Sequence, residues 1–160
     1  MNVELPIPTH LQKYLKPIGD ANKERFVKGN MVCQCGCDVF SVRESNDRLL
    51  VKLMCRDCES EILLFDSGKH GWDGFVCGED CLDRSESFRE YKCSQCGQPF
   101  FRVSVSISSQ GKQDFIDECV SEDDSFLIDQ WVDAFDWITV SLQCEPCAHT
   151  ERGWLDLETM

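Results

Sequence analysis

The sequence predicts a small α+β protein with two antiparallel β units, a connector between them and short helices. The first observation is a repeat, in which VKLMCRDC at 51–58 matches VSLQCEPC at 140–147 at Val, Leu and both cysteines, with an offset of 89 residues. The second is the alternation of apolar and polar residues over short segments. The third is a count of 12 cysteines in 160 residues, which indicates that halves too small for a large core are stabilised by bound metal.

The N-terminal residues 1–30 are predicted to form a helical segment that packs as a lid on the first β unit. Thr9 is a candidate N-cap for a first short helix that carries Leu11 and is limited by Pro17. A second short helix is expected to end at Gly29. No separate activity is assigned to this segment.

Residues 31–76 are predicted to form the first β unit, followed by an acidic connector at 77–92. Its strands are expected at 39–44, 48–54 and 61–66, with a polar hairpin connection between the first two.

Residues 93–160 are predicted to form the second β unit. Apolar residues alternate along 100–108, and a turn then leads to a predicted return strand at 113–120. Ser121 is expected to cap an acidic helical insertion. Two further strands are predicted, one at 137–142 and a last one around Leu155.

Cysteine spacing identifies the candidate metal ligands. Two cysteines separated by one or two residues can present both sulfurs to one ion, and a following glycine lets the backbone turn toward them. Each half has one such pair before its hairpin and one after it. The predicted ligands are Cys33, Cys35, Cys55 and Cys58 in the first unit, and Cys93, Cys96, Cys144 and Cys147 in the second.

These motifs resemble those of the zinc-ribbon superfamily, through CQCG at 33–36 with CRDC at 55–58, and CSQCG at 93–97 with CEPC at 144–147. The resemblance implies two structural Zn²⁺ ions, each in a closed four-thiolate shell with no open position for water or substrate. The first unit departs from the common pattern in its one-residue spacing. Cys37 is therefore an alternative ligand in the first unit. An iron–sulfur cluster is the alternative to zinc for four cysteine ligands.

Four cysteines lie outside these two sets. Cys77 and Cys81 are four residues apart and could contribute to a third metal site if they were helical, whereas Cys37 and Cys119 have no such partner. Burial as small apolar side chains explains all four more simply.

The net charge of −13 is concentrated at the C-terminal end, where residues 113–160 hold thirteen acidic side chains against Arg152 alone. Such a chain repels nucleic acid and attracts basic proteins. Residues 1–8 show no basic region followed by an apolar one, and the sequence has no run of about 18 apolar residues, so we expect neither a leader nor a membrane span. We therefore expect a cytoplasmic protein with reduced thiols, no membrane contact and no direct nucleic-acid contact.

The acidic insertion is the candidate partner-binding surface, although a solvated helix face over an aromatic core explains its composition equally well. An aromatic anchor within an acidic field would suit a basic partner. The predicted partner-binding residues are Asp123, Asp124, Asp129, Trp131, Asp133 and Asp136.

The function predicted from these features is non-catalytic. The chain is similar in kind to an immunity protein or antitoxin that binds and masks a basic toxin, such as a nuclease. The alternative is a zinc-ribbon adaptor in a transcription or nucleic-acid-processing complex. An enzyme is the third class, since His70, Trp72 and Asp73 form a small constellation, but a packed turn explains them better.

Overall fold

The computed structural model describes residues 5–19, 25–45, 50–66, 89–109, 111, 113, 117 and 131–159. Within these ranges the protein is mostly β, with one 3₁₀ helix, η1, and nine strands. None of the helices described there is long and apolar enough to cross a membrane. The elements are η1 (Thr9–Leu11), β1 (Leu15–Pro17), β2 (Phe26–Met31), β3 (Phe40–Glu44), β4 (Leu50–Cys55), β5 (Glu61–Asp66), β6 (Arg89–Glu90), β7 (Phe100–Ser108), β8 (Trp137–Cys144) and β9 (Thr150–Glu158).

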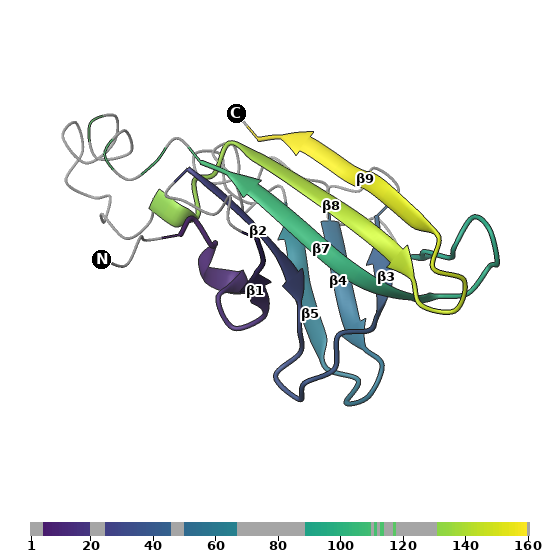
Figure 1. Cartoon of the computed structure of the whole chain (residues 1–160). Helices are drawn as coiled ribbons and strands as arrows, with labels where there is room; N and C mark the ends of the chain where they lie inside the picture. Colours follow the sequence, from purple (N-terminus) through teal and green to yellow (C-terminus); the bar gives the residue numbers. More distant parts are fainter. Residues whose placement is uncertain are drawn as a thin grey trace.

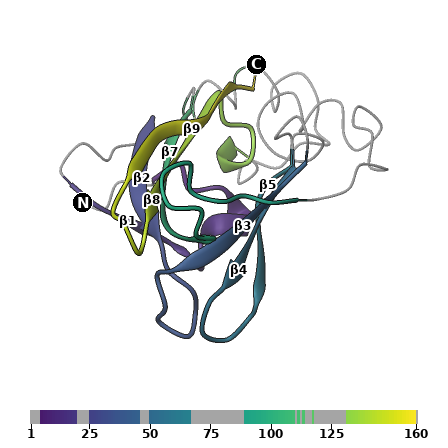
Figure 2. The same cartoon turned by 90° about the vertical axis from the view of Figure 1, so that its right-hand side faces the viewer.

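All nine strands belong to one antiparallel sheet. Its main path runs β1-β2-β7-β3-β4-β5, while β8 and β9 continue from the other edge of β7 and β6 pairs with β3. The sheet curls, so that the part containing β7, β8 and β9 and the part containing β3, β4 and β5 cross at an angle (Figures 1 and 2).

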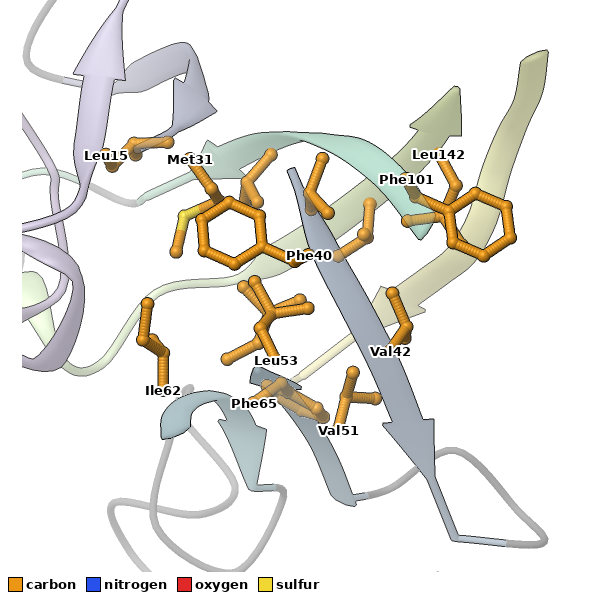
Figure 3. Packing of buried hydrophobic residues seen from close by; sticks show 14 of the residues in the cluster. Leu15, Met31, Phe40, Val42, Val51, Leu53, Ile62, Phe65, Phe101 and Leu142 are labelled. Carbon is orange, nitrogen blue, oxygen red and sulfur yellow. The ribbon is translucent and has the colours of Figure 1, made fainter. Parts of the chain in front are cut away.

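The concave side of this curl holds the hydrophobic core. Along β7 the residues Phe101, Val103, Val105 and Ile107 are buried, which confirms the predicted alternation. Figure 3 shows Phe40 of β3 and Leu53 of β4 pointing into the space that Met31 of β2 also enters. The core is therefore shared by strands from both predicted units.

The two repeats have the same strand arrangement. The segment β3-β4-β5 corresponds to β7-β8-β9, because Phe40 lies opposite Cys55 just as Phe101 lies opposite Cys144. The connection after each strand matches too, since the Glu59 amide donates to the Cys55 carbonyl (3.0 Å) and the equivalent Ala148 amide to the Cys144 carbonyl (2.8 Å).

The repeats meet where β3 pairs with β7. Phe40 and Phe101, which are equivalent positions, lie opposite each other, so an approximate two-fold axis passes between them. Each repeat also supplies a strand to the other. The strand β2, which leads into Cys33, pairs with β7, and β6, which leads toward Cys93, pairs with β3. One continuous sheet thus runs through both predicted units.

The helices predicted for residues 1–30 are wrong where this segment is described. Only Thr9–Leu11 is helical, as a single 3₁₀ turn, and Leu15–Pro17 and Phe26–Met31 are strands. The physical reason is long-range pairing, because β7 offers an unpaired edge that β2 fills with Val27 and Met31 directed into the core.

The predicted pairing of 100–108 with 113–120 is also wrong. Phe101 lies opposite Cys144 on one side and Phe40 on the other, and β2 continues along the second side. Both edges of β7 are therefore occupied. Most of the predicted return strand, residues 121–130 of the predicted acidic helix and most of the connector lie outside the described residues.

Replacing Phe101 with Ala should lower the free energy of unfolding by about 3–5 kcal/mol, because it leaves a cavity at the junction of the two repeats. Urea unfolding followed by tryptophan fluorescence measures this change. Ser106→Ala, on the same strand but facing away from the core, is the matched control and should change little. Equal midpoints for the two variants would contradict the assigned junction.

Candidate metal centres

The structure brings together the two predicted cysteine sets. In each set all four sulfur atoms lie within 4.8 Å of one another. In the first centre Cys33 Sγ lies 3.4 Å from Cys58 Sγ, and Cys35 Sγ lies 3.5 Å from Cys55 Sγ. Two cysteines of this centre, Cys33 and Cys55, are buried and the other two are exposed.

The second centre repeats this arrangement at the other end of the junction. Cys93 Sγ lies 3.7 Å from Cys147 Sγ, and Cys96 Sγ lies 3.4 Å from Cys144 Sγ. Cys93 and Cys144 are buried, whereas Cys96 and Cys147 are exposed. Each centre could therefore hold a metal ion at the edge of the core, with half of its ligands facing solvent.

The donor set and its spacing fit zinc. A tetrahedron with Zn–S bonds of about 2.3 Å has S–S edges of about 3.8 Å, close to the distances between these sulfurs. Disulfides have S–S distances of about 2.05 Å, and the cysteines of both centres are free thiols. Four thiolates with tetrahedral spacing suit zinc or an iron–sulfur cluster better than harder ions, which prefer oxygen ligands.

Backbone turns hold the sulfurs in place. Gly36 and Gly97 follow the first cysteine pair of each centre with φ of +96° and +75°, a conformation that glycine adopts at low cost. Glu59 and Ala148 follow the second pair, also with positive φ, at 60° and 62°. The strain at these two non-glycine residues is equivalent in the repeats, as expected for turns built around a common ligand geometry.

Two contacts beside the cysteines were not identified from the sequence. Ser60 Oγ lies 3.1 Å from Cys58 Sγ, and Arg56 forms an ion pair with Glu145 at 3.7 Å. Arg56 and Glu145 each follow the first cysteine of the second pair, so this ion pair links the two centres. Alignment of CRDC with CEPC, which places an arginine opposite a glutamate, was the available signal.

The thiols of each centre have unequal acidities. Burial raises the pKa of Cys33 and of Cys144 to about 12. Hydrogen bonds to Ser60 lower the pKa of Cys58 to about 6. Burial acts to raise the pKa of Cys93, but hydrogen bonds from the backbone amides of Cys96 and Gln95, together with those of the Cys144 and Cys147 side chains, lower this pKa to about 6. Each centre therefore contains a thiolate at neutral pH beside a buried thiol.

Cys37 does not belong to the four-sulfur group of the first centre. It is buried, and its sulfur lies 3.4 Å from the Val39 amide nitrogen. The four-sulfur group that could hold an ion at the first centre thus contains Cys33 and Cys35. Cys77, Cys81 and Cys119, and with them the third metal site, lie outside the described residues, as do His70, Trp72 and Asp73.

The predicted partner-binding residues are placed only in part. Trp131 is 4% exposed, which contradicts its role as a surface anchor. Asp133 accepts hydrogen bonds from the Thr9 amide and hydroxyl, at 2.8 and 2.9 Å, and so caps η1. Asp136 is half-buried, and Asp123, Asp124 and Asp129 lie outside the described residues. The acidic surface therefore stays a prediction.

No protein-family model, curated protein or solved structure matches this chain.

Replacing Cys144 with Ser should lower the bound metal from about two ions per chain to one or fewer and lower the melting temperature, because metal binding and folding are coupled. Inductively coupled plasma mass spectrometry of the purified protein measures the metal. Cys37→Ser is the control, since Cys37 lies outside the four-sulfur group, and it should keep about two ions. A Cys144→Ser protein with two ions would contradict the assigned ligands.

Metal binding at about pH 7.5 should release fewer than four protons per ion. Cys58 and Cys93, with pKa values of about 6, are already deprotonated at that pH, whereas Cys33 and Cys144, at about 12, must still lose protons. Affinity should fall as the pH decreases through neutrality, because the other thiols must lose protons, and more steeply below about pH 6, where Cys58 and Cys93 also gain protons. Calorimetric titration in buffers of different ionisation enthalpy counts the protons. Release of four protons per ion would contradict these acidities.

Proposed function

We propose that this protein is a non-catalytic, zinc-stabilised inhibitor that binds and masks a basic protein, in the manner of an immunity protein or antitoxin against a nuclease toxin. The supporting observation is the charge, with a net value of −13 and one basic side chain against thirteen acidic ones in residues 113–160. A nuclease carries a basic groove for phosphates, and an acidic protein can dock there quickly and exclude the substrate.

Metal binding strengthens this bias. Each tetrathiolate zinc adds about two negative charges to the protein. Acidic side chains also surround the centres, with Asp57 and Glu59 exposed and Glu145 half-buried. Arg56 opposes them, but it is paired with Asp57 at 3.8 Å and with Glu145 at 3.7 Å. Both metal centres therefore add negative charge to that of the C-terminal acidic segment.

A structural role for both zinc ions follows from their ligand sets. Four thiolates complete the tetrahedron, so neither ion has an open position at which to activate water. The proposed work of the ions is to hold the two repeats folded. Acidic side chains then make the contact with the partner, and Asp123, Asp124 and Asp129 stay candidates. Trp131 is buried and is no longer a candidate.

The proposal predicts that reversing two charges of the acidic segment slows binding. Asp123→Lys with Asp124→Lys should reduce the association rate with the captured partner by about tenfold or more at low salt, and by less at high salt. The matched control is Glu61→Lys with Glu90→Lys, which makes the same charge change at two exposed positions of the sheet outside residues 113–160. Surface plasmon resonance at two salt concentrations measures the rates.

The partner is first captured from the native host with the zinc-loaded protein and identified by mass spectrometry. Capture of one basic nuclease whose activity the protein inhibits would support the proposal. Capture of polymerase, ribosome or repair subunits without inhibition would replace it with the adaptor function. Equal association rates for the two double variants would remove the acidic segment from the interface.

A further inference from the structure

A hollow of about 240 Å³ lies on the outer face of the sheet, where β2, β7, β8 and β9 run side by side (Figure 1). The side chains that alternate with the core residues of β7 and β8 point to this face, so the hollow is separated from the core by the sheet itself. Its neutral polar lining comes from Asn30, Ser104, Ser141, Gln143 and Thr150.

The charges in the hollow balance. Arg102 Nε lies 3.6 Å from Asp38 Oδ2, and both side chains are about half exposed. The remaining polar side chains are hydroxyls and carboxamides, which both donate and accept hydrogen bonds. A free anion would meet the carboxylate of Asp38, and a free cation would meet the guanidinium of Arg102. The lining therefore favours a neutral ligand with many hydrogen-bonding groups.

A bulge in β9 shapes the hollow. The register between β8 and β9 shifts between Val140 and Leu142, so that β9 has extra residues opposite Ser141. Gly153 lies in this bulge with φ of +64°, and its amide donates to Ser141 Oγ at 3.1 Å. Bulges of this kind redirect strands beside functional sites, and here the bulge holds the Ser141 hydroxyl in a fixed position.

The first repeat shows which side chains stand at the positions equivalent to the lining of the hollow. Ser104 pairs with Ser141 and Gln143 with Thr150, and in the first repeat the equivalent pairs are Arg43 with Lys52 and Met54 with Glu61. Short hydroxyl side chains in one repeat thus correspond to long charged ones in the other.

These long side chains also pair with each other. Lys52 Nζ lies 3.3 Å from Glu61 Oε1, so the ion pair extends over the face that is left open around Ser141 and Thr150. The corresponding face is covered in one repeat and hollow in the other. The repeats differ there both in their side chains and in the bulge, which has one extra residue in β5 and two in β9.

We propose that this hollow binds a neutral, hydroxyl-rich ring, such as a single sugar residue. Its volume lies below the range of about 300–1,000 Å³ for pockets that enclose drug-sized ligands, so it fits one ring or the terminal residue of a longer glycan. The described lining residues include no aromatic ring on which a nucleobase would stack. This inference does not depend on the proposed inhibitor function.

The test is a titration of the zinc-loaded, isotope-labelled protein with a panel of methyl glycosides of hexoses and N-acetylhexosamines, followed by NMR. At least one glycoside should shift the backbone amides of Asn30, Ser104, Ser141 and Gln143. Inorganic phosphate and free arginine serve as charged probes and should leave these amides unchanged. Shifts with a charged probe and none with any glycoside would overturn the proposal, as would no shifts with the whole panel.

The repeat supplies the variant that fills the hollow without changing the net charge. Ser141→Lys with Thr150→Glu installs the ion pair of Lys52 and Glu61 and should weaken glycoside binding by about tenfold or more. Gln143→Met copies Met54 and removes one side-chain amide from the hollow. It is the milder variant, for use if the double variant does not retain two metal ions. Unchanged affinity in a variant that keeps both ions would overturn the proposal.

Discussion

The pairing of β3 with β7 is the contact on which the rest of the structure depends. A three-stranded hairpin unit with one hydrophobic face has little apolar surface to bury on its own. When Phe40 and Phe101 lie opposite each other, the two units become a single curled sheet whose concave side encloses one core. The approximate two-fold relation then brings the strand leading into each metal centre onto the other repeat.

This exchange of strands links the two metal centres through the sheet. Cys33 is preceded by β2, which pairs along the second repeat, so an ion at the first centre anchors a strand of the second repeat's sheet. Cys93 is preceded by β6, which pairs with β3 in the same way. The ion pair between Arg56 and Glu145 adds a direct link, although an exposed pair contributes only about 0–1 kcal/mol. The shared strands and core therefore carry most of the coupling.

Patterns within short segments of the sequence correctly predicted two strands and the grouping of the cysteines. The boundaries of Glu61–Asp66 and Phe100–Ser108 agree with the prediction, as does the grouping of all eight cysteines, because alternation and ligand spacing are properties of short segments. The partners of β7 depend instead on which distant segments reach its edges. Leu15 and the segment from Phe26 to Gly29 were predicted as helix, because their own residues do not show that they pair with a distant strand. The sequence left Trp131 open between a surface anchor and an aromatic core, because an amphipathic pattern does not show which face is covered, and its burial favours the core.

The repeats also show how one backbone can present two different surfaces. Equivalent turns, hydrogen bonds and positive φ angles surround both metal centres, so the ligand geometry constrains both copies alike. The outward-facing positions are free of that constraint, and there the copies differ, with Lys52 and Glu61 covering one face while Ser141 and Thr150 leave the other open. A polar face of small side chains gives the sheet no added stability through burial or ion pairing. The metal centres and the junction therefore keep the scaffold alike in the two copies, while the outward-facing side chains and the size of the bulge differ.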